Sequence, residues 1–165
     1  MALLLIVVVR LLTPVLRIRF GVLVSQRIGH FAANTEIYLC ERDAGLHGKR
    51  AVDLFCNSTV ICNQQLNKMW ARILPVHQWV NPMTRVNGWI PGWKANTIPV
   101  GNGRDTQGLL AMSPPHLSFT EEEEAEGKAA IRAMGIPEDA TVVAFHTRDS
   151  AYLKQALPHV DWSGH

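Results

Sequence analysis

The stretch VLRIRFGVLV, residues 15–24, decides the fold, because β-branched and apolar side chains alternate there with arginines, as in a strand. A polar turn, SQRIGH, follows at residues 25–30. Small and apolar side chains then recur at helical spacing until Gly45; they are Ala33, Ile37, Cys40 and Ala44. These residues predict a strand, a loop and a helix in succession.

The same succession of elements occurs again further along the chain. The segment AVDLF, residues 51–55, predicts a second strand, and a helix is expected from Asn63. One face of that helix is apolar, with Leu66, Met69, Trp70 and Ile73. We also expect a short third strand within residues 73–79. Alternating elements of this kind predict an α/β fold, with a Rossmann-like parallel sheet flanked by helices.

Residues 86–115 are rich in Gly, Pro, Asn and Trp, and regular structure is hard to assign to them. A connection of this length is either a long ordered loop or part of an active-site wall. We interpret the tryptophans of this half of the chain as core or cleft-wall residues rather than as platforms for sugar stacking. They are Trp70, Trp79, Trp89 and Trp93.

The C-terminal part begins with a strong helix signal. The sequence TEEE at residues 120–123 matches a capping box, and Gly135 with Pro137 marks the end of the helix. The segment TVVAF, residues 141–145, then predicts a buried strand, and another helix is expected after it. We therefore expect an N-terminal apolar segment at 1–16, a Rossmann-like domain at 17–115, and an incomplete second domain at 116–165.

Charge and cysteine content limit the classes of function. The net charge of +2 does not favour a nucleic-acid-binding protein. The three cysteines form no CxxC pair, which indicates a reducing, cytoplasmic compartment. The sequon that starts at Asn57 is then a chance match. The histidines form no HxxxH or HExxH pattern, so we expect no metal.

The N-terminus is both apolar and basic. Residues 2–9 are wholly apolar, which is too short for a membrane span of roughly 20 residues. No acidic residue precedes Glu36, whereas four arginines do: Arg10, Arg17, Arg19 and Arg27. Such a segment is either a buried leading element or an anchor that lies on an anionic membrane surface.

The first candidate for chemistry is the run His146, Arg148, Asp149 and Ser150, which follows the strand predicted at 141–145. Ligands of open α/β sheets bind beyond the carboxyl ends of the strands. An arginine fork suits a diphosphate, and a following helix start adds backbone amides. The alternative is that these residues only cap a helix or pair on the surface.

The second candidate lies between the first predicted strand and its helix. Gly29 would permit a tight turn or close backbone approach, and Arg27 and His30 flank it. His30 would orient a ligand or move a proton near neutral pH. Asn34 and Glu36 follow closely, and Glu36 would act as a base if it faces the cleft. The alternative is an ordinary strand-to-helix turn.

Several of these segments resemble, in order, a family of bacterial glycosyltransferases. They are RIGHFAANTEIYLCERDAG, ICNQQLNKMW, PPHLSFTEEEEAEGKAAIRAMGIPEDA and VVAFHTRDSAYL. The arrangement is more remotely similar to GT-B fucosyltransferases, in which a His-x-Arg motif contacts the sugar nucleotide. That resemblance implies that His146 and Arg148 contact the donor, and that Arg27, Gly29 and His30 face the same cleft. Residues 86–108 match the family poorly.

The resemblance implies a metal-independent sugar transfer from a nucleotide sugar, such as a GDP-linked one, to a surface glycan or a lipid-linked acceptor. Family members continue into a complete donor-binding domain, so we expect this chain to be a fragment that is inactive alone. Two other hypotheses stay open. One is a non-catalytic α/β module that binds a partner or a membrane surface, and the other is a phosphate-ester hydrolase.

Overall fold

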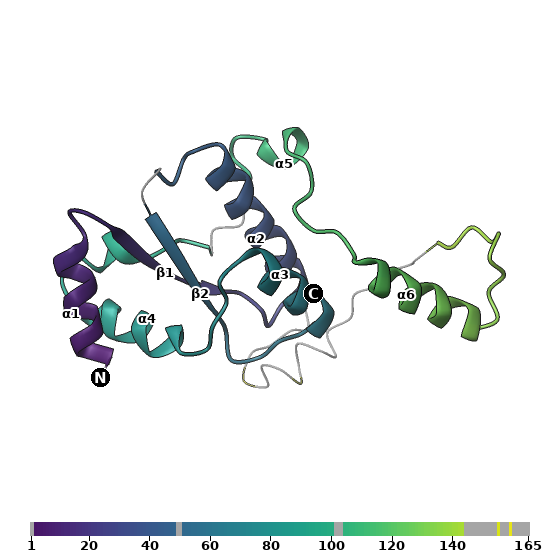
Figure 1. Cartoon of the computed structure of the whole chain (residues 1–165), viewed down its shortest axis with the longest axis horizontal. Helices are drawn as coiled ribbons and strands as arrows, with labels where there is room; N and C mark the ends of the chain where they lie inside the picture. The colour runs from purple at the N-terminus through teal and green to yellow at the C-terminus, as the bar shows by residue number, and fades with distance from the viewer. Residues whose placement is uncertain (1, 49–50, 101–103, 144–154, 156–158, 160–165) are drawn as a thin grey trace. The chain divides into compact units, whose positions relative to one another are not determined.

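The structure is a computed structural model that describes residues 2–48, 51–100, 104–143, 155 and 159 (Figure 1). The chain divides into two compact units, Met1–Thr120 and Glu121–His165. Unit 1 contains a two-stranded parallel sheet with helices on both faces, and the described part of unit 2 contains one helix. The expected mixed α/β architecture is therefore confirmed at this level.

The sheet consists of β1 (Arg17–Leu23) and β2 (Ala51–Asn57), which pair in parallel from Arg17–Ala51 to Leu23–Asn57. Both strands were predicted from their sequence. The chain passes from β1 to β2 through α2 (Ile28–Asp43), the crossover that a parallel pair requires. Side chains of successive strand residues point to opposite faces, so each strand contributes to two separate cores.

The first core lies between the sheet, α2 and α3 (Gln64–Ile73). Phe31 of α2 and Trp70 of α3 are almost fully buried in it, and the Trp70 indole Nε1 donates to the Phe31 carbonyl at 3.0 Å. Asn63 caps α3, because its Oδ1 accepts from the Leu66 amide at 2.8 Å. Both predicted helices are present. In α2, Ile37 and Cys40 are buried as predicted, but Ala33 is exposed and Ala44 is the exposed C-cap residue, so the predicted apolar face is only partly right.

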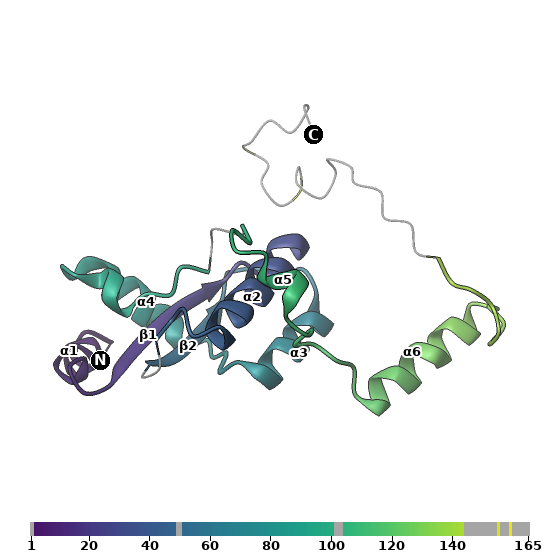
Figure 2. The same cartoon turned by 90° about the horizontal axis from the view of Figure 1, so that it is seen from above.

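The second core lies on the other face of the sheet, against α1 (Ala2–Leu12) and α4 (Val80–Trp89). Figures 1 and 2 show these two helices on the opposite side of the sheet from α2 and α3. It contains Ile6, Phe20, Cys56, Val80 and Met83. Arg10 ties the two helices together, since its guanidinium donates to Asn87 Oδ1 at 2.9 Å and to the Pro91 carbonyl at 3.2 Å.

Helix α4 extends into the region from residue 86, to which regular structure was hard to assign from the sequence. Pro82 falls in its first turn, where a missing amide hydrogen costs no helical hydrogen bond. A short 3-10 turn, η1 (Trp93–Asn96), follows after Gly92, whose φ of 78° suits glycine. The buried Asn87 side chain joins the two elements by donating to the Trp93 carbonyl at 3.2 Å.

The prediction of a third strand within residues 73–79 is wrong, apart from a single bridged residue, Val76. Ile73 ends α3, and only an isolated bridge joins Val76 to Phe55 of β2. A second such bridge joins Thr97 to Phe20 of β1. Short extended segments therefore flank both strands, but their pairing is too brief to widen the sheet.

A buried ion pair joins the two strands. Arg19 and Asp53 are direct cross-strand partners, and the guanidinium donates two parallel hydrogen bonds of 2.6 Å to the carboxylate. The side chains are only 10% and 11% exposed. Tyr38 of α2 also donates its hydroxyl to Asp53. Burial, followed by the hydrogen bond to Asp53, raises the pKa of Tyr38 far above its usual range, so the phenol stays protonated.

Unit 1 ends with a segment that includes α5 (Leu109–Met112). The Asp105 carboxylate accepts from the Leu109 and Leu110 amides at 2.8 and 2.9 Å, which orders the start of this short helix. Hydrogen bonds to these amides, that of Leu110 first, lower the pKa of Asp105. The helix was not predicted.

Unit 2 contains α6 (Glu121–Ala133), which confirms the helix predicted from the acidic run. Gly135 has a φ of 81°, a left-handed conformation that ends the helix as expected. Residues 141–143 have no strand pairing within the described structure. The remainder of the strand predicted at 141–145 lies outside the described residues.

Three further expectations concern the covalent state and location of the chain. Cys40, Cys56 and Cys62 are all free thiols, as expected. Asn57 of the sequon is 3% exposed and its amide donates to Asn67 at 2.7 Å, so it is buried rather than presented for glycosylation. In the described part of the chain, no helix has the length and apolar character to cross a membrane.

Candidate functional site

The loops that follow β1 and β2 meet at the carboxyl edge of the sheet, where the sequence predicted a site. Ser25 Oγ lies 2.7 Å from Ser58 Oγ and donates to the Val60 carbonyl at 2.7 Å. Ser58 is also hydrogen-bonded to Gln26. This serine cluster was not predicted, because its members come from loops 33 residues apart. It holds the two loops together through its own internal hydrogen bonds.

The predicted residues after β1 occupy the first turns of α2. Arg27 is the N-cap residue, with an extended backbone. Gly29 lies inside the helix without a positive φ, and a Cβ at this position would meet no atom within 4 Å. The protein itself therefore makes neither the tight turn nor the close backbone approach that Gly29 was expected to permit, and the binding role of Gly29 stays a prediction.

His30 and Asn34 lie together on α2, four residues apart. The Asn34 amide and the His30 Nδ1 are separated by 3.3 Å. His30 is exposed, whereas Asn34 is 4% exposed. This pair leaves the imidazole edge open to solvent beside the carboxyl end of β1.

Glu36 faces a different environment, an open pocket of about 440 Å³. Glu36 and Trp70 line this pocket together with small and apolar side chains: Ala32, Ala33, Leu110, Ser113, Pro115 and Leu117. We call it the Glu36 pocket. It lies between α2, α3 and the segment that contains α5. The wall from α2 and the wall from the α5 segment come from residues about 75 positions apart in the sequence.

His116 holds this distant segment against α2. Its backbone amide and Nδ1 both contact Glu36 Oε1, at 3.1 and 2.9 Å, and its Nε2 lies 3.0 Å from Asp43 Oδ2. A carboxylate at each ring nitrogen favours the doubly protonated imidazolium. Burial lowers the pKa of His116, but hydrogen bonds to Asp43 and Glu36 outweigh it, so the pKa is raised. The His116 hydrogen bond is the largest cause that lowers the pKa of Asp43.

The sequence did not identify His116 as a partner of Glu36. A signal was present in the spacing of Glu36, Cys40 and Asp43, which places acidic and thiol groups on one face of a helix. Nothing in the spacing indicates which of the seven histidines would meet that face, because residue 116 lies 80 positions further on.

The same neighbourhood has the residue types of a metal centre. Within the described ranges, the donor atoms of Glu36, Cys40 and His116 lie within 4.8 Å of one another. Carboxylate, thiolate and imidazole together form a donor set that suits zinc. The ion pairs of His116 with Glu36 and Asp43 already account for the placement of its ring. The expectation of a metal-free site stays a prediction.

The predicted site residues of α2 thus fall into two groups. Glu36 follows His30 by six residues, which turns it about 120° around the helix axis. Consistent with this, Glu36 lines the pocket and His30 does not. The structure places Arg27, His30 and Asn34 near the carboxyl edge of β1, and Glu36 on the side of α2 that faces α3.

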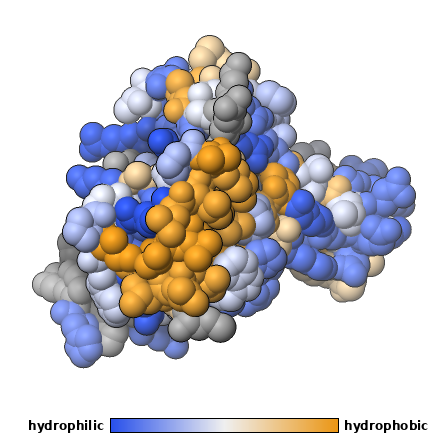
Figure 3. Space-filling model, turned by 60° about the vertical axis from the view of Figure 1, so that its left-hand side comes forward, coloured by the Kyte–Doolittle hydropathy of each residue, from blue (hydrophilic) through white to orange (hydrophobic). Residues whose placement is uncertain are grey.

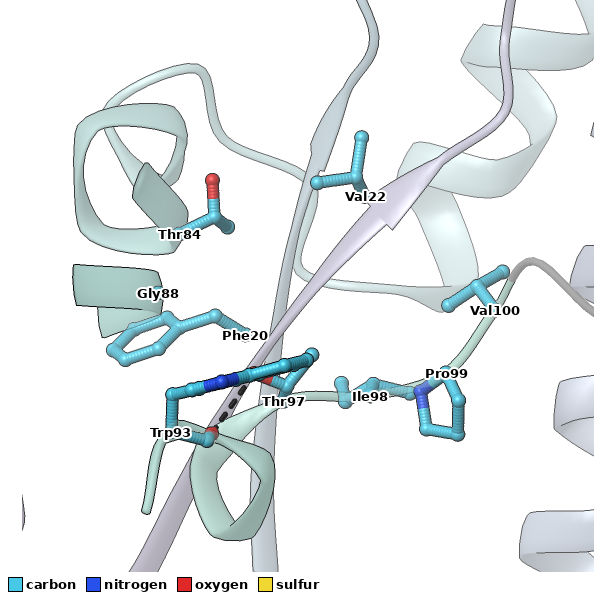
Figure 4. A pocket seen from close by; sticks show the side chains of 9 residues that line it. All are labelled: Phe20, Val22, Thr84, Gly88, Trp93, Thr97, Ile98, Pro99 and Val100. Atoms are coloured by element: carbon cyan, nitrogen blue, oxygen red, sulfur yellow. Dashed lines mark hydrogen bonds between the residues drawn. The ribbon is translucent and has the colours of Figure 1, made fainter. Parts of the chain in front are cut away.

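A second pocket, of about 370 Å³, lies on the other face of β1 (Figure 4). Phe20 and Val22 of β1, Thr84 and Gly88 of α4, and Trp93 line it together with residues 97–100. Trp93 is therefore a pocket-wall residue, as interpreted from the sequence. Trp70 is a core residue that also reaches the Glu36 pocket. The interpretation is wrong for Trp79 and Trp89, which are 55% and 80% exposed and line neither of these two pockets.

The donor-side residues predicted from the strand at 141–145 lie outside the described residues. They are His146, Arg148, Asp149 and Ser150. Comparisons with protein families, with curated proteins and with solved structures found no match to this chain.

Proposed function

We propose that this chain is the acceptor-side part of a GT-B glycosyltransferase, with the start of its donor-binding domain. The proposal rests on the ordered sequence resemblance, and the observation that supports it most directly is the placement of Glu36. A carboxylate lines a pocket with one aromatic wall, supplied by Trp70, and apolar surroundings. Sugar and lipid-linked acceptors suit such a pocket, because their rings and chains present apolar surface and their hydroxyl groups seek a polar partner.

The chemistry assigned to Glu36 is proton removal from an acceptor hydroxyl. The acceptor oxygen forms a bond to the anomeric carbon of the donor, while the bond from that carbon to the diphosphate breaks and the diphosphate leaves with the electron pair. The proton of the hydroxyl passes to the Glu36 carboxylate. In the described structure the hydrogen bonds of Glu36 all go to Oε1, which leaves Oε2 for this step.

His116 is a positioning residue in this proposal. Its two contacts with Glu36 Oε1 fix the carboxylate, and its contact with Asp43 fixes the imidazole. Arg148 would stabilise the leaving diphosphate and His146 would polarise the donor site, in a reaction that needs no metal. Arg27, His30 and Asn34 would bind substrate at the carboxyl edge of β1. Three free cysteines favour a cytoplasmic location for this reaction.

Calorimetric titration with GDP, UDP and their sugars tests the donor side. Saturable binding of one nucleotide by the wild-type chain, lost in Arg148→Ala, is the expected result. Absence of binding by a chain with intact helical circular dichroism would remove the donor side of the proposal. It would favour the second candidate, a non-catalytic α/β module peripheral to a membrane, for which the exposed apolar surface of α1 is the supporting observation.

The acceptor side has a matched pair of variants. Glu36 and Asp43 each contact His116 through a carboxylate, and the variants Glu36→Gln and Asp43→Asn convert that carboxylate to an amide. Only Glu36 lines the pocket. Binding of simple glycosides, followed through the Trp70 indole proton by NMR, should weaken in Glu36→Gln and persist in Asp43→Asn. Equal effects of the two variants would show that Glu36 acts only through His116.

A further inference from the structure

Helix α1 exposes an unusual amount of apolar surface for an element at the edge of a folded unit. Every residue of α1 except Arg10 is apolar, and of these only Ile6 is buried. The exposed fraction reaches 69% at Leu4 and 75% at Leu11, and Val15 just beyond the helix is 82% exposed. Figure 3 shows a continuous apolar patch on the side of the molecule where α1 lies.

The patch consists of nine large apolar side chains: Leu3, Leu4, Leu5, Val7, Val8, Leu11, Leu12, Val15 and Leu16. We call it the α1 patch. An exposed apolar surface of this kind marks an interaction site rather than ordinary solvent-facing surface. Ile6 and Arg10 attach the helix to unit 1 through the second core and through Asn87, so the patch is presented on a fixed scaffold.

Helix α1 and the two elements that it contacts most, α4 and β1, contain basic residues but no acidic ones. Exposed cations occur on the elements that contact α1 or adjoin α4, at Arg17 of β1, Arg85 of α4 and Lys94 of η1. No acidic residue occurs in residues 1–35 or 54–104. The carboxylate of Asp53 on β2 is already paired with Arg19. An apolar surface whose neighbouring elements carry only cations complements an apolar layer beneath anionic headgroups.

Exposed tryptophans extend this surface. Trp89 at the end of α4 is 80% exposed and Trp93 of η1 is 40% exposed. The contacts of Arg10 with Asn87 and Pro91 place the C-terminal end of α1 beside this region. Tryptophan is enriched at the headgroup level of membranes, because its ring is amphipathic.

We infer that the α1 patch docks unit 1 on the surface of an anionic lipid bilayer, with α1 lying in the plane of the interface. Its 11 residues span about 16 Å, roughly half of the hydrocarbon thickness, so the helix lies on the membrane and does not cross it. A second copy of the chain is a poorer occupant, because a symmetric dimer would bring the cations of both copies together without any carboxylate. The inference does not depend on the proposed sugar transfer.

Co-sedimentation of the full chain with vesicles tests the inference. The vesicles are phosphatidylcholine alone, or phosphatidylcholine with about a third of phosphatidylglycerol, at low and high salt. We expect binding to the anionic vesicles that weakens as salt screens the headgroups. Binding to neutral vesicles as tight as to anionic ones would overturn the assignment of an anionic surface.

A matched pair of variants tests whether vesicle binding depends on the α1 patch or on any exposed leucine. The double variant Leu4→Glu with Leu11→Glu should lower the affinity for vesicles about tenfold or more. The reason is that two leucine side chains would no longer be transferred from water into the bilayer. Leu46→Glu, at a 50% exposed leucine after α2, should leave binding within about twofold of the wild type. Circular dichroism would show that both variants fold.

Two results would overturn the inference. One is the absence of vesicle binding by a folded, monomeric chain. The other is a dimer in lipid-free solution, detected by analytical ultracentrifugation and lost in the double variant, because a second copy would then be the occupant of the patch.

Discussion

Helices α1 and α2 differ in a way that their compositions do not suggest. Helix α1 is almost wholly apolar and buries only Ile6. Helix α2 has the mixed sequence IGHFAANTEIYLCERD and buries seven residues, among them the polar Asn34 and Thr35. The more apolar helix is thus the more exposed one.

The number of neighbours around each helix explains the difference. Helix α2 lies over the sheet, with α3 on one side and the segment around His116 on another. Helix α1 lies at the edge of unit 1 and packs mainly against α4. Burial is therefore decided by how many surfaces cover a helix. Polar residues such as Thr35 are tolerated inside because they find partners, here the Phe31 carbonyl at 2.8 Å.

The largest expected effect is at Phe31, which is fully buried between α2, α3 and the sheet. Phe31→Ala removes a large side chain from a packed core and should lower the free energy of unfolding by about 4 kcal/mol. Urea denaturation followed by circular dichroism measures it. A loss below about 1 kcal/mol would mean that α2 is not the better covered helix.

Asp53 should show the next largest effect, because it links the sheet to α2 through Arg19 and Tyr38. Asp53→Ala leaves the buried Arg19 guanidinium without its carboxylate, at a cost of about 3 kcal/mol. The double variant Arg19→Met with Asp53→Ala should recover part of that loss, since it leaves no unpaired buried charge. Urea denaturation of both variants decides between these outcomes, and equal losses would contradict the role assigned to the ion pair.

His116 should have a smaller effect that depends on pH. Its folded pKa is raised, so its contribution is fully present below the unfolded pKa of about 6.5 and is lost as the pH rises through the folded pKa. We expect His116→Gln to lower the free energy of unfolding by up to about 1 kcal/mol at pH values near 6, and by much less near pH 9. Urea denaturation at the two pH values tests this, and a loss that does not change with pH would indicate packing alone.

The smallest effect on folding is expected in the α1 patch. Leu11 is 75% exposed, so Leu11→Gln should change the free energy of unfolding by no more than about 0.5 kcal/mol. Ile6 lies five residues before Leu11 on the same helix and is fully buried, so Ile6→Ala should cost about 2 kcal/mol or more. Urea denaturation of the pair checks the contrast. A large loss for Leu11→Gln would show that α1 is covered by the protein itself.

Much of the local structure could be predicted from the sequence. The spacing of Ala33, Ile37 and Cys40 predicted α2, and the spacing of Leu66, Met69 and Trp70 predicted α3. Helix α4 was missed because Pro82, Gly88 and two asparagines conceal a helix whose stability comes from packing against α1 and the sheet. Of the candidate site, the structure shows that Glu36 lines a pocket, that it faces away from His30, and that it contacts His116, which was not foreseen; the roles of the predicted residues stay predictions.

By itself the sequence determined the strands β1 and β2, most helix positions and the basic, apolar character of the N-terminus, because these depend on neighbouring residues and on the periods of the helix and the strand. Only the tertiary structure decided that α1 stays exposed, that Arg19 and Asp53 pair across the sheet, and that His116 meets Glu36. These outcomes depend on which surfaces meet when the chain folds. Such contacts join residues tens of positions apart, and local periodicity carries no record of them.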